Sequence, residues 1–415
     1  MAVTEAQARR ALRRADVPWD EQVADPRKDI NLKHSHHGLL GLLAAAFACG
    51  RVRLRRVEDF CEDLSSAARR KLDVGRRVSD SALYGLLKKQ SPKGLRETLY
   101  AQVREMVKRR LIQRDLFPQG VLSVDGKSIW TSTATGVEGA KVSVGKHAGV
   151  ITSSLMAVRA VLTSSRARPC LDQEVIGEKA GEPPAFRVLF GRVAEEFGHL
   201  FEIVTADAGI CCRENALLLL GAGKRYLFSL KGNQPTLEAA ALGLFAQSSG
   251  PVLARTEECR SGARLRRELQ AVDVAGCAEV VFPGAVQFWR VVQQSWLGQT
   301  LLSEEVRYFI TDLSATTLGA ERALQLVRLH WGIENGANWT MDVALVEDDV
   351  APCQQSKDSI EVVSWLRVLG YNLLAATRAS APLKDRRPQP WVRTMERLRD
   401  AFCLNLEEPR PATIG

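Results

Sequence analysis

Two aspartates and one glutamate stand where they could hold metal ions for phosphodiester chemistry. Asp125 ends the apolar run 121–124. Asp207 ends the β-prone run 201–206, and each aspartate is followed by a small residue, as at the end of a buried strand. If the two strands are neighbours, both carboxylates emerge at one edge of a sheet. Glu334 lies in a later helical segment, which would pack back on that sheet and supply a third carboxylate.

Carboxylates in such an arrangement predict a hard divalent cation. Two carboxylates held close repel each other unless a cation lies between them. Mg²⁺ and Mn²⁺ prefer oxygen ligands, and two such ions about 4 Å apart activate the attacking and leaving oxygens of a phosphodiester. The three acids therefore predict a site for two ions. For any one acid alone, a turn, a helix cap or a solvated position is the commoner role.

The spacing of apolar residues changes along the chain, and with it the secondary structure expected to position these acids. Residues 1–115 have apolar residues at helical spacing, so we expect a helical N-terminal domain. Short apolar runs then alternate with helical segments, which predicts a mixed α/β catalytic domain over residues 118–378. Within it, residues 236–312 are expected to form a β-rich insertion. Residues 379–415 are expected to be a mobile C-terminal tail.

Basic residues are concentrated in the expected helical domain. The formal net charge of +9 is mild for 415 residues and does not by itself indicate a nucleic-acid partner. Arginines cluster, however, in residues 9–14, 51–56 and 69–77. A domain that lies along DNA phosphates has this pattern, and it predicts salt-sensitive binding. Each cluster taken singly is more often a solvated helix face.

Cysteine usage and hydropathy bear on the compartment. The chain has nine cysteines, an odd number without metal-ligand spacing, which is typical of a reducing compartment. Its start is charged and lacks the apolar run of a secretory signal. The longest apolar stretch, residues 38–48, is too short to span a bilayer. We therefore expect a cytoplasmic protein without a membrane partner.

Four motifs occur in order around the three acids. They are Asp-Gly-Lys at 125–127, Thr-Ala-Asp-Ala at 205–208, Leu-Lys-Gly-Asn-Gln-Pro-Thr-Leu at 230–237 and His-Trp-Gly-Ile-Glu-Asn at 330–335. The last block continues through Trp339, Asp342, Glu347 and Arg367 to Asn372-Leu373-Leu374. In this order the motifs resemble the H-repeat-associated group of insertion-sequence transposases. Asp-Gly-Lys alone is a weak signal, whereas the octapeptide and the Trp-Gly-Ile-Glu-Asn block are specific. The resemblance extends from the N-terminal helical segment to about residue 378.

The resemblance implies a fold, a reaction and partners. The fold is a ribonuclease-H-like α/β core in which Asp125, Asp207 and Glu334 are a DDE triad that binds two Mg²⁺ or Mn²⁺ ions. A β-rich insertion separates the second and third acids. The reaction is metal-dependent cleavage at an element's end, followed by attack of the freed 3′-hydroxyl on target DNA. The implied partners are double-stranded DNA, both element ends and target, and a second copy of the chain in a DNA-bound homodimer.

Neighbours of the triad are expected to contact DNA or to support the acids. The expected DNA contacts are Lys127, Lys231, Asn233, Gln234, Arg328, His330 and Asn335. Lys179 and Glu182 match the group's Lys-Ser-Asn-Glu segment, which makes Glu182 an accessory acid and Lys179 its companion. Each residue has a structural alternative: Lys231 is equally a surface lysine, Asn233 and Gln234 could cap a turn, and His330 could pack beneath Trp331.

The chain departs from the group's pattern at several positions. Gly209-Ile210 stand where the group has Leu-His, and Trp130 replaces a basic residue. Asn338 replaces a histidine, and arginines are missing around residues 351–353. Because the lost residues include expected phosphate contacts, a catalytically degenerate or domesticated transposase that acts as a DNA-binding protein is the main alternative.

Three other functions remain open at this stage. The first is a nuclease on the same core that nicks DNA without strand transfer. The second is a zinc protein that uses His34, His36, His37 and Cys49, whose spacing is poor for a zinc site. The third is a glycosidase with paired carboxylates, which the flanking motifs do not favour.

Overall fold

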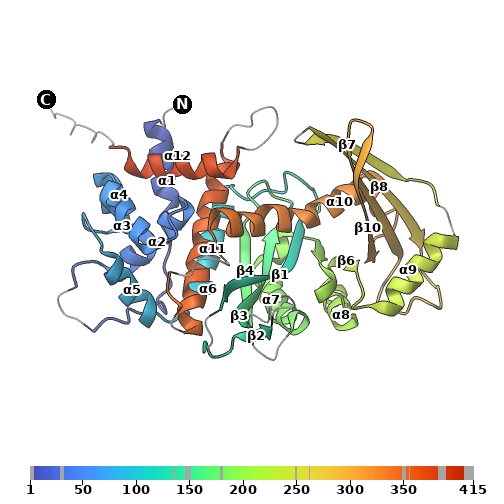
Figure 1. Cartoon of the computed structure of the whole chain (residues 1–415), viewed down its shortest axis with the longest axis horizontal. Coiled ribbons are helices and arrows are strands. Elements are labelled where there is room, and N and C mark those ends of the chain that lie inside the picture. The colour runs from blue at the N-terminus through green and yellow to red at the C-terminus, as the bar shows by residue number, and fades with distance from the viewer. Residues whose placement is uncertain are drawn as a thin grey trace. The chain divides into compact units, whose positions relative to one another are not determined.

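The computed structural model has a mixed α/β fold built on one large mixed sheet (Figure 1). The α/β class expected from the sequence is therefore confirmed. The chain divides into two compact units. The helical unit comprises Met1–Gln113, Ser128–Met156 and Asn338–Gly415, and the sheet unit comprises Arg114–Lys127 and Ala157–Ala337. The structure describes residues 4–28, 32–133, 136–144, 151–177, 181–247, 250–260, 262–347, 352–354, 356–381 and 389–405.

Eight α-helices of the described residues make up most of the helical unit. They are α1 (Glu5–Arg14), α2 (His36–Ala48), α3 (Leu54–Asp63), α4 (Ser66–Leu72), α5 (Asp80–Lys89), α6 (Leu95–Lys108), α11 (Lys357–Ala379) and α12 (Trp391–Cys403). Thr4, Ser35, Ser65 and Ser79 each accept a hydrogen bond from the first turn of α1, α2, α4 and α5, which explains where these helices begin. Helix α11 packs on α2 and α6 (Figure 1). A Cβ at Gly370 would lie 2.6 Å from the Ala44 carbonyl oxygen, so only glycine allows α2 and α11 to approach this closely.

Helix α12 corrects the expectation of a mobile tail from residue 379 onward. Trp391, Met395, Leu398 and Phe402 are buried and recur at intervals of three and four residues, which is the period of a helix with one apolar face. The ring of Phe402 packs edge-on against Phe60 of α3, with 5.8 Å between centroids. The proline and arginine content of residues 379–415 suggested a tail, although the apolar residues of α12 recur at helical spacing. The compact units also follow boundaries other than those expected, since α11 and α12 group with the N-terminal helices.

The sheet follows the order β2-β3-β1-β5-β6-β10-β9-β8-β7, with β4 beside β3. Strand β1 is parallel to β5 and β5 is parallel to β6, whereas β10, β9, β8 and β7 continue the sheet in antiparallel pairs. Strands β1 and β3 each run from one unit into the other. The strands are β1 (Val121–Ser132), β2 (Lys141–Val144), β3 (Ile151–Leu162), β4 (Cys170–Ile176), β5 (Ile203–Ala206), β6 (Arg225–Leu230), β7 (Ala254–Arg260), β8 (Ala263–Asp273), β9 (Gln287–Leu297) and β10 (Thr300–Thr311).

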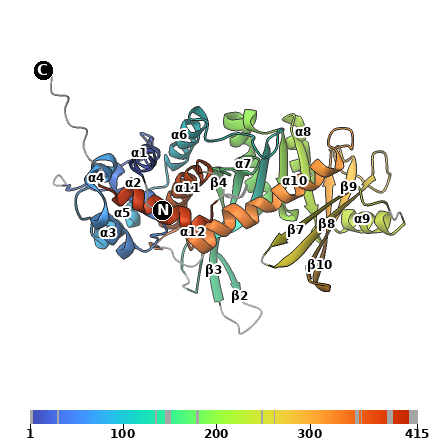
Figure 2. The same ribbon diagram turned by 90° about the horizontal axis from the view of Figure 1, so that it is seen from above.

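Helices of the sheet unit cover its strands. They are α7 (Glu182–Phe197), α8 (Arg213–Gly221), α9 (Pro235–Gln247) and α10 (Ala320–Gly332), with short 3-10 turns η1 (Gly198–Leu200) and η2 (Ala208–Ile210). Helix α10 continues into two π-helical segments, η3 (Ile333–Asn338) and η4 (Thr340–Ala344), the second of which groups with the helical unit. Helix α8 packs on β6. Helix α7 packs on β4, and α10 on β7 and β8 (Figure 2). Among the described residues, no helix combines the length and apolar character needed to cross a membrane.

One hydrophobic core joins the central strands to the later ones. Val121 of β1 and Ile203 of β5 belong to the same buried cluster as Trp289 of β9, Phe309 of β10 and Val327 of α10. The segment expected to be β-rich, residues 236–312, contains β7–β10 but begins with most of helix α9. Because this core is continuous, α10 is fixed against the same sheet that carries the two aspartates.

Candidate active site

Strand register brings Asp125 and Asp207 to neighbouring positions. The parallel pairing of β1 with β5 ends at Val124 opposite Ala206, so the two aspartates are the next residues on adjacent strands. The condition set by the sequence, that the two strands be neighbours, is therefore met. Strand β1 does not end at Asp125, however. It continues to Ser132, since β3 lies on its other side.

The carboxylate of Asp207 is held by two donors from β6 and the loop after it. Ser229 donates a hydrogen bond of 2.6 Å from Oγ to Oδ1, and Lys231 lies with Nζ 3.3 Å from Oδ2. Burial by itself would raise the pKa of Asp207. The hydrogen bonds from Ser229 and the backbone N–H of Ala208, together with Lys231, outweigh burial and lower that pKa. Asp207 is therefore kept ionised and ready to bind a cation.

Asp125 has the opposite environment. Burial raises its pKa to about 7, and the negative charges of Glu334, Asp207 and Glu182 contribute in that order. The pKa of Glu334 is likewise raised by burial and by Asp207, although Arg307 opposes the shift. Four carboxylates thus lie close enough to disfavour one another's charge. A bound cation would remove that repulsion.

Glu182 occupies a space that only glycine leaves open. It is the first residue of α7, and its carboxylate lies against the Cα atoms of both Gly126 and Gly209. A Cβ at either glycine would collide with the Glu182 carboxyl oxygens. Burial and the charge of Asp207 raise the pKa of Glu182. Glu182 therefore lies beside the two aspartates, whereas Lys179 lies outside the described residues.

Glu334 follows the end of α10, in the π-helical segment η3. Single π-turns within α-helices occur frequently at functional sites. One helical turn earlier, His330 is buried with 2% of its surface exposed, and its Nδ1 lies 3.2 Å from Thr205 Oγ1. Burial lowers the pKa of His330 to about 4, so the ring is neutral. This contact ties the helix that carries Glu334 to the strand that carries Asp207.

Sequence reasoning missed a buried chain of hydroxyl groups beneath the acids. Thr205 donates to Ser123 over 2.9 Å, and Ser123 is 2.7 Å from Thr163. Ser123 and Thr205 are paired in register, and each stands two residues before an aspartate of the site. Residues two apart in a strand share a face, so a hydroxyl at that offset before each aspartate was a usable signal.

The octapeptide that follows β6 fastens the loop after Asp207. Asn233 donates from Nδ2 to the carbonyl oxygen of Ala208, and Gln234 donates from Nε2 to that of Cys211 over 2.8 Å. Both amides were expected to contact DNA or to cap a turn. Here their N–H groups bind the protein backbone and hold the conformation of the loop.

The other residues expected to contact DNA differ in how far their side chains are exposed. Lys127 is 8% exposed and His330 is buried, so neither side chain is on the open surface. Lys231 is exposed beside Asp207, and the exposed side chain of Arg328 makes a 2.9 Å ion pair with Glu258. The side chain of Asn335 lies outside the described part of the structure.

A basic cleft of about 450 Å³ opens beside Glu334. Four guanidinium groups and two carboxylates line it, together with Trp331: Arg168, Arg267, Arg307, Arg328, Glu258 and Glu334. The guanidinium of Arg307 lies over the ring of Trp331, 4.9 Å from its centroid. The sequence did not predict this cleft, because α10 and β8–β10 are brought together only by the fold.

The residues present fit a hard divalent cation in chemical type. The donors of Asp125, Asp207, Glu334 and Glu182 are all carboxylate oxygens, which Mg²⁺ and Mn²⁺ prefer. Among the described residues, no three His, Cys, Asp or Glu side chains are already gathered as a complete ligand set. Ion binding would therefore draw these carboxylates closer together, with Asp125 giving up its proton.

The zinc alternative considered from the sequence is wrong. His36 is the first residue of α2 and Cys49 follows its last. Cys49 is thirteen positions after His36, and at the rise of an α-helix this places them roughly 20 Å apart, too far for one ion. His36 instead lies with Nε2 2.7 Å from Gln90 Oε1.

Asp125→Asn is expected to stabilise the metal-free protein above neutral pH. A carboxyl whose pKa is raised on folding favours the folded state below its unfolded pKa, and that contribution is lost as pH rises through about 7. We expect a gain of roughly 1–3 kcal/mol at about pH 8 and a much smaller one at about pH 5. Denaturant unfolding in EDTA measures both. A variant less stable than wild type at the higher pH would contradict this electrostatic account.

Two proteins of Escherichia coli strain K12 are similar to this chain. "H repeat-associated putative transposase YhhI" is 26% identical over 187 residues, which are 42% of this chain and 47% of that protein. The resemblance to the H-repeat-associated transposases is confirmed. "Putative protein YbfL" is 26% identical over 189 residues, with the same shares of the two chains. The match spans about half the length of these relatives.

Neither family models nor solved structures strengthen the similarity to these two proteins. No family model matches the chain. A cryo-EM structure of a piggyBac transposase synaptic complex with hairpin DNA covers 97% of this chain and 82% of that chain, with 9% sequence identity and a TM-score of 0.45. A likeness that distant says nothing about the function.

Two positions at which the chain departs from the sequence pattern of the H-repeat-associated transposases have a structural explanation. Gly209, which replaces a leucine of the group, leaves the space that the Glu182 carboxylate fills. Trp130, which replaces a basic residue, is 2% exposed and donates from Nε1 to Gln354 Oε1 over 2.9 Å. Both substitutions are accommodated by packing, and neither removes an acid of the site.

Proposed function

We propose that this protein is a DDE transposase that cleaves and joins DNA strands at the ends of its own insertion element. Asp125, Asp207 and Glu334 are the catalytic acids and bind two Mg²⁺ or Mn²⁺ ions. The observation that carries the proposal is the parallel register of β1 and β5, which makes the two aspartates neighbours, with Glu334 close enough to raise the pKa of Asp125. The strand order β4-β3-β1-β5-β6 supports a ribonuclease-H-like core.

The proposed reaction has two displacement steps at phosphorus. In the first, water attacks a phosphodiester at the element's end, and the bond to the departing 3′ oxygen breaks. In the second, the freed 3′-hydroxyl attacks a target phosphodiester and displaces a target 3′ oxygen. Bound divalent ions supply activation of the attacking oxygen and stabilisation of the leaving one. No protein nucleophile is needed.

The chain's own residues prepare the site for these steps. Ser229 and Lys231 keep Asp207 ionised, while the contact of His330 with Thr205 fixes the helix that precedes Glu334. Glu182 adds a fourth carboxylate beside the triad, and we propose that it positions the aspartates or binds one ion.

We propose that DNA phosphates enter the basic cleft beside Glu334. Arginine binds phosphate oxygens through two parallel N–H groups, and the cleft offers four guanidinium groups. Lys231 and the N-terminal arginines would extend the contact, and a DNA-bound homodimer in the cytoplasm is the working state that the resemblance implies. A direct DNA contact by Lys127, Asn233, Gln234, His330 or Asn335 is proposed on the resemblance alone. In this structure Lys127 and His330 are buried, and the amides of Asn233 and Gln234 bind the protein backbone.

DNA binding by the cleft is expected to depend on salt. Each phosphate contact contributes a slope of about −0.9 in log affinity against log salt concentration. Arg307→Gln and Arg328→Gln should each weaken binding several-fold and reduce the slope by about one. Arg322→Gln is the matched control for Arg328→Gln. Arg322 is exposed on α10, the helix that carries Arg328, but does not line the cleft. Equal salt slopes in Arg328→Gln and Arg322→Gln would remove Arg328 from the interface.

The products of the reaction test the proposed function. Wild-type protein is incubated with Mn²⁺, DNA that carries the flanking ends of the encoding gene, and a labelled target. A transposase yields element 3′ ends joined to the target. Cleavage without joining would indicate the nicking nuclease instead. DNA binding with neither product would indicate the degenerate, DNA-binding alternative.

A further inference from the structure

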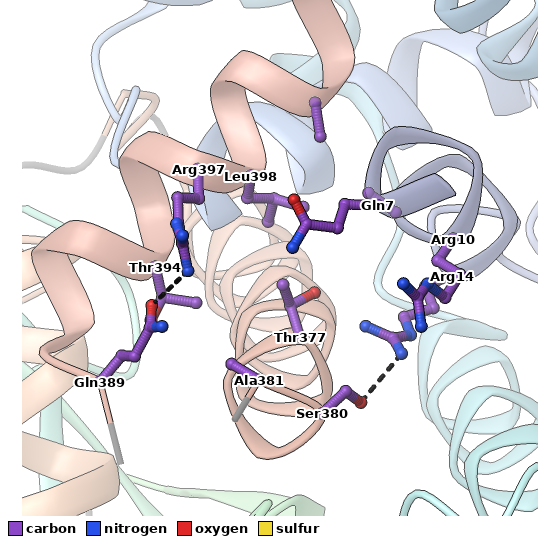
Figure 3. Close-up of a pocket in the computed structure, with 12 residues that line it drawn as sticks. Gln7, Arg10, Arg14, Thr377, Ser380, Ala381, Gln389, Thr394, Arg397 and Leu398 are labelled. Atoms are coloured by element: carbon purple, nitrogen blue, oxygen red, sulfur yellow. Dashed lines mark hydrogen bonds between the residues drawn. The ribbon is translucent and has the colours of Figure 1, made fainter. Parts of the chain in front are cut away.

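A second cavity lies in the helical unit, among α1, the end of α11, α12, and the residues Ala381 and Gln389 (Figure 3). Its volume is about 210 Å³. Arg10 and Arg14 line it from α1, Thr377 and Ser380 from the end of α11, and Arg397 from α12. None of the acids of the candidate active site lines this cavity, so the function proposed for that site does not account for it.

Three guanidinium groups of this cavity lack a carboxylate counter-ion within the described residues. Arg14 donates to Ser380 Oγ over 2.9 Å, and Arg397 donates to Gln389 Oε1 over 2.9 Å, as Figure 3 shows. Arg10 donates to the backbone oxygen of Ala6 over 3.1 Å. The three hydrogen-bond partners are neutral, and no described Asp or Glu lines the cavity.

Two other arginines near the cavity do have carboxylate partners. Arg9 forms an ion pair with Glu5, and Arg399 forms one with Asp400. Burial lowers the pKa of Arg14, and the positive charges of Arg10, Arg109 and Arg13 lower it further. A half-buried charge surrounded by like charges is costly unless an anion compensates it. The cavity is therefore electrostatically prepared for a negative ligand.

We propose that this cavity binds a phosphate group through Arg10, Arg14 and Arg397. Guanidinium groups bind phosphate oxygens in a bidentate manner, and the hydroxyls of Thr377 and Ser380 add hydrogen-bonding partners. Ala11, Leu398 and Ala401 supply apolar wall, which strengthens the attraction by excluding water. About 210 Å³ is below the usual range of pockets for whole drug-sized ligands, which favours a phosphate group over a complete nucleotide.

The phosphate could belong to a DNA backbone or to a small free molecule. The test therefore has two arms, both performed on the full-length chain: thermal stability against inorganic phosphate, and fluorescence anisotropy with a random-sequence DNA duplex. Arg14→Gln and Arg397→Gln remove single guanidinium groups. Arg393→Gln is the matched control, because Arg393 is an exposed residue of α12 that does not line the cavity. Ala381→Leu reduces the space without changing charge, which keeps the test valid if an arginine variant fails to fold.

The expected result is a loss confined to the cavity variants. Arg14→Gln, Arg397→Gln and Ala381→Leu should each weaken phosphate binding by about tenfold or more, and Arg393→Gln should not. A matching loss in DNA affinity, with phosphate competing for the duplex, identifies a DNA phosphate as the ligand. Unchanged DNA affinity identifies a free phosphate compound. The proposal is overturned if cavity variants and Arg393→Gln behave alike in both arms. Neither arm measures cleavage, so failure of this proposal can be distinguished from failure of the proposed cleavage chemistry.

Discussion

Asp207→Asn is expected to reduce metal-dependent strand cleavage by roughly a thousandfold or more, which corresponds to about 4 kcal/mol of transition-state stabilisation. Asparagine keeps the shape and accepts the Ser229 hydrogen bond, but it lacks the charge that attracts a divalent ion. Asp125→Asn and Glu334→Gln should have losses of the same order. Cleavage of an end-labelled duplex that carries the gene's flanking sequence measures the rate.

DNA affinity should not fall in these three variants, because the acids do not attract phosphates when no ion is bound. Glu202→Gln is the matched control, since Glu202 is an exposed carboxylate of the same unit that pairs with Arg114. A variant that cleaves at the wild-type rate removes its residue from the triad. Weakened binding in parallel with weakened cleavage would instead indicate a folding defect.

Gly209→Ala and Gly126→Ala are expected to lower cleavage by roughly a hundredfold, the order of effect of a displacement of about 1 Å near reacting groups. A methyl group at either position collides with the Glu182 carboxylate. Glu182 must then move, and it disturbs the two aspartates that it contacts electrostatically. Gly191→Ala is the control, because Gly191 lies in α7 with open space around it. That control should be active and slightly more stable, since alanine favours helix.

A double variant separates displacement of Glu182 from general strain. If Glu182 is the group through which the glycines act, Glu182→Gln should itself reduce cleavage, and Gly209→Ala should add little to it. Non-additivity of this kind is the signature of residues that act together. Full activity of Glu182→Gln, with a large loss in Gly209→Ala, would show that the glycine acts on something else.

The parts of the site that the sequence could predict are those encoded locally. Asp125 and Asp207 each follow an apolar run, and parallel pairing then makes them neighbours. The sequence does not contain the register itself, which depends on the packing of β1, β5 and β6 together. Ser229 as a donor to Asp207 follows from that register and could not be derived from its own segment.

Contacts between distant segments account for most of what sequence reasoning missed. Glu182 reaches Gly126 and Gly209 only because α7 begins beside the middle of β1 and the loop after β5. The basic cleft forms only because α10 packs on β7 and β8, from which strands β9 and β10 separate it in the sequence. Helix α12 was missed for another reason, because its composition resembles that of a tail while its apolar residues keep a helical period.

A matched motif does not tell which of its side chains touch a ligand. Asn233 and Gln234 lie in the most specific motif of the chain, yet their amide N–H groups bind the loop after Asp207. His330 opens another motif and is buried against Thr205. These residues hold the loop after Asp207 and the helix before Glu334 in place, and this structural role explains their presence in the motifs.

The most direct test of the central claim is a count of Mn²⁺ ions bound per chain, measured by electron paramagnetic resonance with element-end DNA present. The claim is that Asp125, Asp207 and Glu334 hold the ions of a DNA-cleaving site. Wild-type protein should bind about two Mn²⁺ per chain, and Asp207→Asn should bind fewer and more weakly. Equal Mn²⁺ binding by wild type and Asp207→Asn, or none by either, would contradict the claim.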